Sequence, residues 1–568
     1  MVSLALKYNY RLYLLIDLTK LFGPLTVVTY VVISLIIPHS ICVGYLTRSL
    51  WTILISIAYW SIETQYTHYM NVREAKKRGA VLVPKLKGKW PGNLDIISAS
   101  MKKHEEGYAL ENMEQFFGDN DTFNLGAMWT DTYFTRNHHI MQAILATHFN
   151  SFHKGPELNM MLRGVFGDGI LATDGAEAKA HRALVRPFFT KDRIRDFEIL
   201  ERYVDKTVTL MRNRALSAQS VDVQDLFQRF TLDAAGEFLF GTKDFNALDS
   251  PLPLPGRIHE ATFLRSLRGR FWAIQELWKD KTQEDNKIID RFVHPLIANA
   301  LKNKKVRGDR KCAIGDGSLV DHLADATNDV KLIRNELFNI LSASRDSTSI
   351  LLTFVIYLLS LHPDVTAKLH NEVMAHLPCG SPTFEDIRKM NYLRAVLNET
   401  LRLFPPIPIN CRTSKSACLI PGDRQTNGKP FYIPSGNKLI FYLPIALQRR
   451  KDLWGDDADD FDPERWIDER VQKWTENPFV FIPFNAGPRV CLGQEFAYNE
   501  ASFMLIRILQ IFDTFTLRQQ EDAPPGSCPP PSWKGCLGRK GLEQIFPKAS
   551  LTLYVKGGCW IQMGLAQN

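Results

Sequence analysis

A cysteine near the C-terminal end of the chain has neighbours that could make its sulfur reactive. Cys491 lies in a loop between an apolar run at 479–484 and a segment with a helical pattern at 494–510. Gly487 lets the backbone approach a flat ligand, Arg489 supplies a cation beside the sulfur, and the expected helix directs the positive end of its dipole at it. We therefore expect a thiolate. Such a thiolate can be the proximal ligand of a haem iron, where it favours O–O cleavage.

Five residues of the same loop follow a characteristic spacing. It reads Phe484-x-x-Gly487-x-Arg489-x-Cys491-x-Gly493 and resembles the haem-binding signature of the cytochrome P-450 monooxygenases. The resemblance implies a fold that is mainly α with small β-sheets (α+β), haem b as the cofactor and Cys491 as the axial ligand of its iron. The alternative is a buried, inert cysteine in a glycine-containing turn.

Two further motifs precede this loop. Residues 391–404 have the apolar spacing of a helix, with Glu399 and Arg402 on the other face and close enough to pair. Glu399-Thr400-Leu401-Arg402 resembles the family's ExxR motif, and residues 461–466 resemble its PERF/PERW motif. The resemblance implies a buried charged triad of Glu399, Arg402 and Arg465 beneath the haem loop. An ExxR pair alone is more often a surface salt bridge.

A long apolar segment at 332–359 is interrupted in its middle by the polar residues 342–349, which we call the polar island. Small hydroxyl residues compete for backbone hydrogen bonds and can loosen a helical turn, which could then host water and O₂. The family has Ala/Gly-Gly-x-Asp-Thr-Thr here, whereas this chain reads Ala343-Ser344-Arg345-Asp346-Ser347-Thr348. Ser344 is expected to narrow the oxygen groove. The resemblance implies that the catalytic residues are Asp346 and Ser347, which deliver protons, with Thr348 able to take over. The alternative is serine-rich helix packing without catalysis.

The haem propionates would need cations. Residues 174–182 resemble the family's helix C region, in which Arg182 matches the arginine of WxxxR and Ala178 replaces the tryptophan. One expected propionate donor is therefore missing. Arg412 and Arg489 match two further propionate arginines, although each alone is more often a surface residue. The resemblance thus implies a cofactor-binding set of Cys491, Arg489, Arg182, Arg412, Phe484, Gly487 and Gly493.

The N-terminal region has the composition of a membrane anchor. Residues 21–37 are mostly apolar and a second apolar stretch follows at 41–60, while a span needs about 20 apolar residues. The seven lysines and arginines between 73 and 89 favour a cytosolic location for the rest of the chain. The alternative is a buried hairpin of two core helices. We expect a transmembrane anchor with one span or two at 1–70, a basic linker at 71–93 and a catalytic domain at 94–568, on the cytosolic face of the endoplasmic reticulum membrane.

The composition argues against several other classes of protein. A net charge of +8 is small for 568 residues; it suits a membrane surface or an acidic protein partner, and we expect no binding to nucleic acid. The nine cysteines are odd in number and lack CxxC spacing, so neither a disulfide framework nor a zinc site is indicated. No low-complexity linker divides the chain beyond residue 93, and the stretches 303–317 and 522–539 are expected to be surface loops.

The chain resembles one branch of the family, and this resemblance implies a reaction. Residues 142–149 and the helix that carries Asp346 resemble the fungal alkane and fatty-acid hydroxylases and their basidiomycete relatives. This implies insertion of one oxygen atom from O₂ into a lipophilic substrate, with electrons from NADPH through NADPH-cytochrome P-450 reductase and cytochrome b5 as a second candidate donor. Three alternatives stay open: a terpenoid or polyketide tailoring oxidase of secondary metabolism, a haem-thiolate isomerase or dehydratase without external electrons, and a non-catalytic membrane haem protein.

Overall fold

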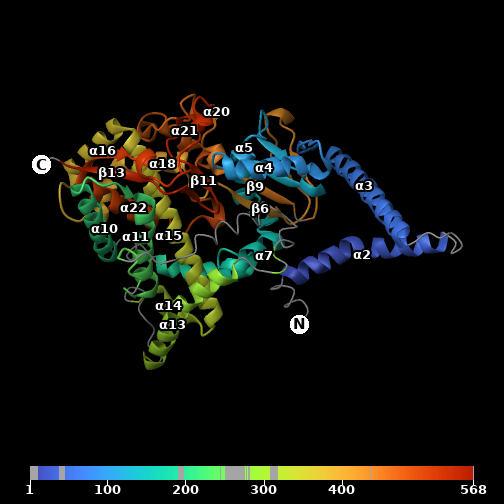
Figure 1. The fold of residues 1–568 in the computed structure, drawn as a ribbon, viewed down its shortest axis with the longest axis horizontal. Coiled ribbons are helices and arrows are strands. Elements are labelled where there is room, and N and C mark those ends of the chain that lie inside the picture. Colours follow the sequence, from blue (N-terminus) through green and yellow to red (C-terminus); the bar gives the residue numbers. More distant parts are fainter. Residues whose placement is uncertain are drawn as a thin grey trace.

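Helix α15 (Val330–Leu361) runs through the core of the computed structural model (Figure 1). Asp329 caps its N-terminus, because the side chain accepts from the backbone N–H groups of Lys331 and Leu332. The helix ends at Leu361, shortly before Pro363, which cannot continue it.

The structure describes residues 10–36, 45–189, 197–243, 245–249, 276, 278, 282–307, 317–436 and 438–566.

The described residues form further helices before and after α15 along the chain (Figure 1). They are α2 (Tyr10–Ile36), α3 (Tyr45–Lys77), α4 (Leu94–Glu106), α5 (Glu111–Glu114), α6 (His138–Gln142), α7 (Gly155–Phe166), α8 (Gly175–Val185), α10 (Glu198–Leu216), α11 (Val223–Phe240), α13 (Gln283–Arg307), α14 (Leu319–Ala326), α16 (Pro363–His376), α17 (Phe384–Lys389), α18 (Asn391–Leu403), α19 (Pro444–Leu447), α20 (Lys451–Trp454), α21 (Val471–Glu476), α22 (Gln494–Leu509), α23 (Gln519–Asp522) and α24 (Arg539–Leu542).

The strands are short. They are β1 (Val81–Leu82), β2 (Thr122–Asn124), β3 (Thr132–Thr135), β4 (Phe152–His153), β5 (Val221–Asp222), β6 (Asn410–Ser414), β7 (Cys418–Ile420), β8 (Phe431–Ile433), β9 (Leu439–Tyr442), β10 (Phe512–Leu517), β11 (Pro547–Ala549), β12 (Leu553–Val555) and β13 (Trp560–Leu565). Within the described residues they form sheets in the orders β2-β3-β9-β6-β4, β1-β8-β7, β10-β13-β5 and β11-β12. The expected class, mainly α with small β-sheets, is confirmed.

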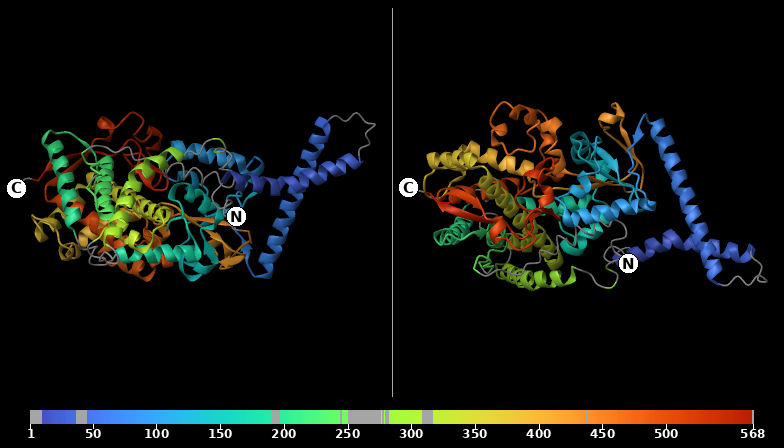
Figure 2. Two further views of the ribbon diagram at one scale, coloured as in Figure 1. Left: turned by 90° about the horizontal axis from the view of Figure 1, so that it is seen from below. Right: turned by 45° about the horizontal axis from the view of Figure 1, so that its top comes forward.

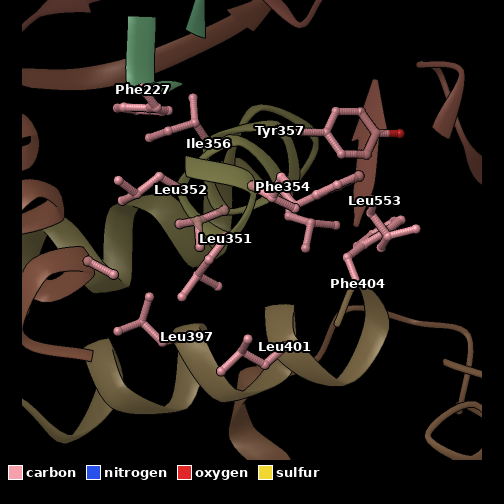
Figure 3. Close-up of a cluster of buried hydrophobic side chains, with 14 of the residues drawn as sticks. Phe227, Leu351, Leu352, Phe354, Ile356, Tyr357, Leu397, Leu401, Phe404 and Leu553 are labelled. Atoms are coloured by element: carbon pink, nitrogen blue, oxygen red, sulfur yellow. The ribbon is translucent and has the colours of Figure 1, made fainter. Parts of the chain in front are cut away.

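Two apolar cores meet along α15. Residues 350–359 pack with α11, α18 and α22, and Figure 3 shows part of this core, in which Phe354 stacks on Phe404 with ring centroids 4.2 Å apart. Earlier side chains such as Ile333 and Leu337 belong to a second core with α8, α13 and α14. The polar island lies between the two cores. It remains regular α-helix, so the loosened turn expected from its serines is not formed.

Helices α2 and α3 form an arm that projects from the rest of the molecule (Figures 1 and 2). They contact each other, and α3 leads into β1, which joins β8 in a sheet. Among the described residues, no single helix is both long and apolar enough to cross a membrane; α15 and α16 meet that test only as a pair, bent by 115°.

Segments expected to be a linker or surface loops contain regular secondary structure or buried side chains. The end of α3, strand β1 and the 3₁₀ turn Pro91–Asn93 all lie within the linker expected at 71–93. In the loop expected at 522–539, Trp533 is buried and its ring packs against those of Tyr108 and Phe546. Of the stretch 303–317, residues 308–316 lie outside the described residues.

Candidate active site

A cavity of about 720 Å³ lies inside the domain. Its wall includes Cys491, and it also includes the polar middle of α15 through Ser344 and Ser347. Much of the remaining wall is apolar and comes from α7, α11 and the strands β3 and β9, with Leu158, Phe238, Phe134 and Phe441 as examples. The cysteine and the hydroxyl groups predicted from separate motifs therefore face one space.

The loop that carries Cys491 is held in place by backbone contacts. The N–H of Cys491 donates to the carbonyl of Phe484 at 3.0 Å, and α22 begins three residues later. Phe484 and Gly493 line the cavity, but Gly487 does not. Gly487 has φ +67°, and a Cβ there would lie 1.9 Å from the carbonyl oxygen of Leu145. This glycine therefore allows close approach to the neighbouring backbone, a contact that the sequence pattern did not indicate.

The Cys491 side chain is accessible from the cavity although protein surrounds it on the other sides. Burial raises the pKa of the thiol, while the N–H of Gly493 and the charge of Arg182 lower it. The influential cation is therefore Arg182 and not Arg489, whose Nη2 donates to the carbonyl of Ile170 at 3.0 Å. The protein alone does not hold Cys491 as a thiolate. A metal that coordinates a thiol deprotonates it.

Positive side chains gather at the cavity wall. Arg182, Arg412 and Arg489, all predicted from the sequence, line it together with Lys154. Burial lowers the pKa of Lys154 well below its usual value, and the charges of Arg489 and Arg412 lower it further. Burial and the charge of Arg412 also lower the pKa of Arg489, whereas Asp174 acts in the opposite sense. These cations repel one another, so an anion in the cavity would stabilise them.

The candidate catalytic residues on α15 separate into two groups. Ser347 and Thr348 line the cavity, and Asp346 does not. Ser347 Oγ donates to the carbonyl of Ala343 at 2.7 Å, and Ser344 Oγ donates to that of Leu341 at 3.2 Å. Asp346 is 7% exposed and lies 3.5 Å from the guanidinium of the preceding arginine. The structure therefore brings two hydroxyls to the cavity but not the carboxylate expected beside Ser347.

A buried acid lies behind Thr348. Glu500 on α22 is 2% exposed, and burial raises the pKa of its carboxyl to about 8, while the nearby Thr348 hydroxyl lowers it. Among the described residues, neither Thr348 Oγ1 nor Glu500 Oε2 makes a hydrogen bond of standard geometry. Because its pKa lies above 7, Glu500 is mostly protonated at neutral pH and can donate a proton.

The predicted triad lies in one buried cluster. Glu399, Arg402 and Arg465 are all 0% exposed. Arg402 Nη2 lies 2.7 Å and Arg465 Nε 3.0 Å from Glu399 Oε1, and Trp466 Nε1 donates to Glu399 Oε2 at 2.9 Å. Desolvation opposes ionisation of Glu399, but the two arginines hold the pKa of its carboxyl below the usual value. This set is a buried network and not a surface salt bridge.

The chain that forms this cavity and cysteine loop is similar to known proteins. A family model described as Cytochrome P450 matches residues 84–533. The chain belongs to the cytochrome P450 family. Cytochrome P450 52A6 of Candida tropicalis is 31% identical over 509 residues, which cover 85% of this chain and 95% of the relative. Cytochrome P450 monooxygenase himC of Aspergillus japonicus is 33% identical over 439 residues, which cover 75% and 76%. A cytochrome P450 of Arthroderma benhamiae is 30% identical over 513 residues, which cover 86% and 93%.

Family membership gives this P450 its cofactor and reaction type. It has the P450 fold, in which helices are mixed with small sheets, and it is an oxidoreductase of the monooxygenase type. The cofactor is a haem whose iron takes a cysteine thiolate, and electrons derived from NAD(P)H arrive through a reductase. The residues present fit this group, because a thiol and four basic side chains line one cavity, where Arg489 repels Lys154, and a haem carries two propionates that would neutralise such cations.

Sequence reasoning missed several residues of this P450. Lys154 belongs to no motif that we recognised, and it reaches the cavity because β4 ends beside it. Glu500 had no clear signal, because the segment that follows Cys491 also contains Glu495 and Arg507 and the sequence does not show which of these side chains is buried. His181 and Glu336 form an ion pair between α8 and α15 at 2.6 Å, which no local pattern indicates.

Proposed function

We propose that Cys491 is the axial ligand of the haem iron and that the enzyme hydroxylates a lipophile of the alkane or fatty-acid class. The observation that carries this proposal is that Cys491 and the hydroxyl-bearing middle of α15 line one cavity whose remaining wall is largely apolar. An apolar wall binds a hydrocarbon chain by excluding water. The resemblance of residues 142–149 to the alkane and fatty-acid branch supports the same class of substrate.

The haem would be held by cations from different parts of the chain. In this proposal Arg182, Arg412, Arg489 and Lys154 bind the propionates, while Phe484 and Gly493 border the cofactor beside Cys491. Gly487 shapes the loop from outside the cavity. The bound haem supplies oxygen activation, and the thiolate ligand favours cleavage of the O–O bond.

Two proton routes are proposed on α15. In the first, Ser347 Oγ, which faces the cavity, passes protons that Asp346 supplies from the adjacent position. In the second, the neutral carboxyl of Glu500 donates toward Thr348 Oγ1, which also lines the cavity. In the second route the acid lies beside the hydroxyl that it would serve, since the Thr348 hydroxyl lowers the pKa of Glu500, whereas Asp346 lies 3.5 Å from the guanidinium of Arg345.

The first 70 residues are proposed to anchor the enzyme in the endoplasmic reticulum membrane. The support is that α2 and α3 expose many large apolar side chains, among them Val27, Leu35, Leu50, Ile57 and Ile62. Basic residues follow at 73–89, so the catalytic domain, proposed at 94–568 with a linker at 71–93, would face the cytosol. Lipophilic substrates could then enter from the bilayer.

The proposed electron donor is NADPH-cytochrome P450 reductase, with cytochrome b5 as a second candidate. The test is NADPH-driven oxygen consumption by the membrane-bound enzyme with added reductase. Consumption that depends on a substrate supports the monooxygenase. Rearrangement of a peroxide without NADPH would favour an isomerase or dehydratase, and haem binding without either activity would favour a carrier. Spectral titration with alkanes, fatty acids and terpenes, followed by product analysis, then identifies the substrate.

The ligand assignment is tested by Cys491→Ser. The reduced wild-type protein with CO is expected to show the red-shifted Soret band of thiolate ligation, and Cys491→Ser is expected to lack it. Cys411→Ser is a matched control, because Cys411 is the other cysteine described at the cavity wall. A Cys491→Ser protein that keeps the band would contradict the assignment.

A further inference from the structure

A carboxylate lies fully buried in the first half of α15. Glu336 is 0% exposed, and its Oε1 lies 2.6 Å from Nδ1 of His181 on α8. No other donor among the described residues reaches this carboxylate. The contact with Glu336 raises the pKa of His181, which favours the imidazolium form. A buried charge with a single partner depends on that partner for its stabilisation.

The residue after His181 contacts the cysteine loop. Arg182 Nη2 donates to the carbonyl of Val490 at 2.8 Å, and Val490 directly precedes Cys491. The charge of Arg182 also lowers the pKa of the Cys491 thiol. His181 and Arg182 are consecutive residues of one helix. Movement of His181 away from α15 would therefore move Arg182 relative to the cysteine.

The segment before α8 is attached to the same part of α15. Asn339 is 0% exposed, and its Oδ1 accepts from the N–H of Leu171 at 2.9 Å. Gly169 lies so close that a Cβ there would be 2.3 Å from the side-chain nitrogen of Asn339. The neighbouring carbonyl of Ile170 accepts from Arg489 at 3.0 Å. The segment thus lies between α15 and Arg489 of the cysteine loop.

Helix α8 also lacks a large side chain at its haem-binding motif. Ala178 is 2% exposed and offers only a methyl group, which cannot donate to an anion. We infer that Glu336 is a positioning residue of the cysteine loop: through His181 it holds α8 so that Arg182 stays hydrogen-bonded to Val490 and keeps its charge beside Cys491. This inference rests on the proposed function, because it takes Cys491 as the iron ligand.

The test follows thiolate ligation in the haem-loaded protein. In Glu336→Gln, which keeps the shape but removes the charge, the red-shifted band of the reduced CO complex should convert to the blue-shifted band of lost thiolate ligation about 10- to 100-fold faster than in the wild type. His181→Gln should accelerate this conversion by a similar factor. The double variant should be no worse than either single variant, because each already breaks the same pair.

Asp233→Asn is the matched control for a merely structural effect. Asp233 is a carboxylate 1% exposed, and it accepts from the N–H groups of Ala247 and Leu248 at 2.7 and 2.9 Å. This variant should unfold at a lower temperature than the wild type. The red-shifted band of its CO complex should nevertheless convert to the blue-shifted band at the wild-type rate. Glu177→Gln, at a mostly exposed position of α8, should change neither property.

The inference is overturned if Glu336→Gln converts no faster than Asp233→Asn at equal thermal stability. It is also overturned if the double variant shows the product of the two single effects. If Glu336→Gln does not accumulate as haem-loaded protein, the same comparison is made with His181→Gln. A wild-type protein that binds haem without any red-shifted band would instead contradict the proposed function.

Discussion

At the scale of single residues, two neighbouring hydroxyls determine what the cavity offers for proton transfer. Ser347→Ala is expected to lower product formation about 10²- to 10⁴-fold while NADPH is still consumed and hydrogen peroxide rises, because a proton relay is lost. Product and peroxide per NADPH are the measurements. Thr348→Ala tests the second route, and the double variant should be worse than either single one. Ser349→Ala is the control, since Ser349 is buried and does not line the cavity. Unchanged coupling in Ser347→Ala, in Thr348→Ala and in the double variant would exclude both routes.

The buried acid Glu500 should make stability depend on pH. Its pKa in the folded protein, about 8, lies above the ordinary value of 4.5, so the folded state binds more protons than the unfolded state between these values. The contribution of Glu500 to stability is therefore fully present below 4.5 and is lost as the pH rises through about 8. Glu500→Gln should remove this loss. Thermal unfolding at several pH values measures it, and parallel curves for the variant and the wild type would contradict the prediction.

At the scale of secondary-structure elements, the triad joins α18 to the PERW segment and to the chain that leads into the cysteine loop. Arg402 Nη1 donates to the carbonyl of Gln448 at 2.8 Å, and the amide oxygen of Gln448 accepts from the N–H of Ile482 at 3.1 Å. Glu399→Ala removes the central acid and leaves two buried arginines without it. We expect a loss of about 3–5 kcal/mol in the free energy of unfolding and a protein that does not retain haem.

The chain contains its own control for this prediction. Glu385 and Arg388 on α17 have the same ExxR spacing, but their side chains are 66% and 64% exposed and lie 3.7 Å apart. An exposed pair contributes at most about 1 kcal/mol, so Glu385→Ala should keep its haem and its CO spectrum. Haem content and chemical unfolding compare the two variants. A haem-loaded, fully active Glu399→Ala protein would show that the triad is dispensable.

At the scale of the whole molecule, the projecting arm and the catalytic domain are expected to be separable. A protein that starts at Arg73 keeps Ala75 and Ala80, which pack with Tyr432, and it keeps β1, which pairs with β8. It should therefore retain haem and its CO spectrum while losing tight membrane association. Sedimentation with membranes and the CO spectrum are the measurements. Loss of haem on truncation would mean that residues before 73 stabilise the domain.

The parts of the site that could be predicted are those with a local signature. The cysteine loop and the PERW segment have characteristic residues a few positions apart, so their spacing identifies them before any folding is considered. The backbone contact of Gly487 could not be predicted in this way, because the sequence shows that a side chain is absent but not which atoms come close. The position of Asp346 could not be predicted either: the packing around α15 decides which part of the helix surface faces the cavity, and Ser347 and Thr348 lie on that part whereas Asp346 does not.

The sequence by itself determined the family and the cofactor and indicated Cys491 as the proposed ligand, because these depend on short motifs in a fixed order. Only the tertiary structure revealed Lys154 among the cavity cations, Glu500 behind Thr348 and Glu336 beside His181. The partners in these contacts come from distant parts of the chain, and burial and charge act through space and not along the sequence. The same spacing of glutamate and arginine is fully buried at Glu399 and exposed at Glu385, since the surroundings alone decide which pair stabilises the fold.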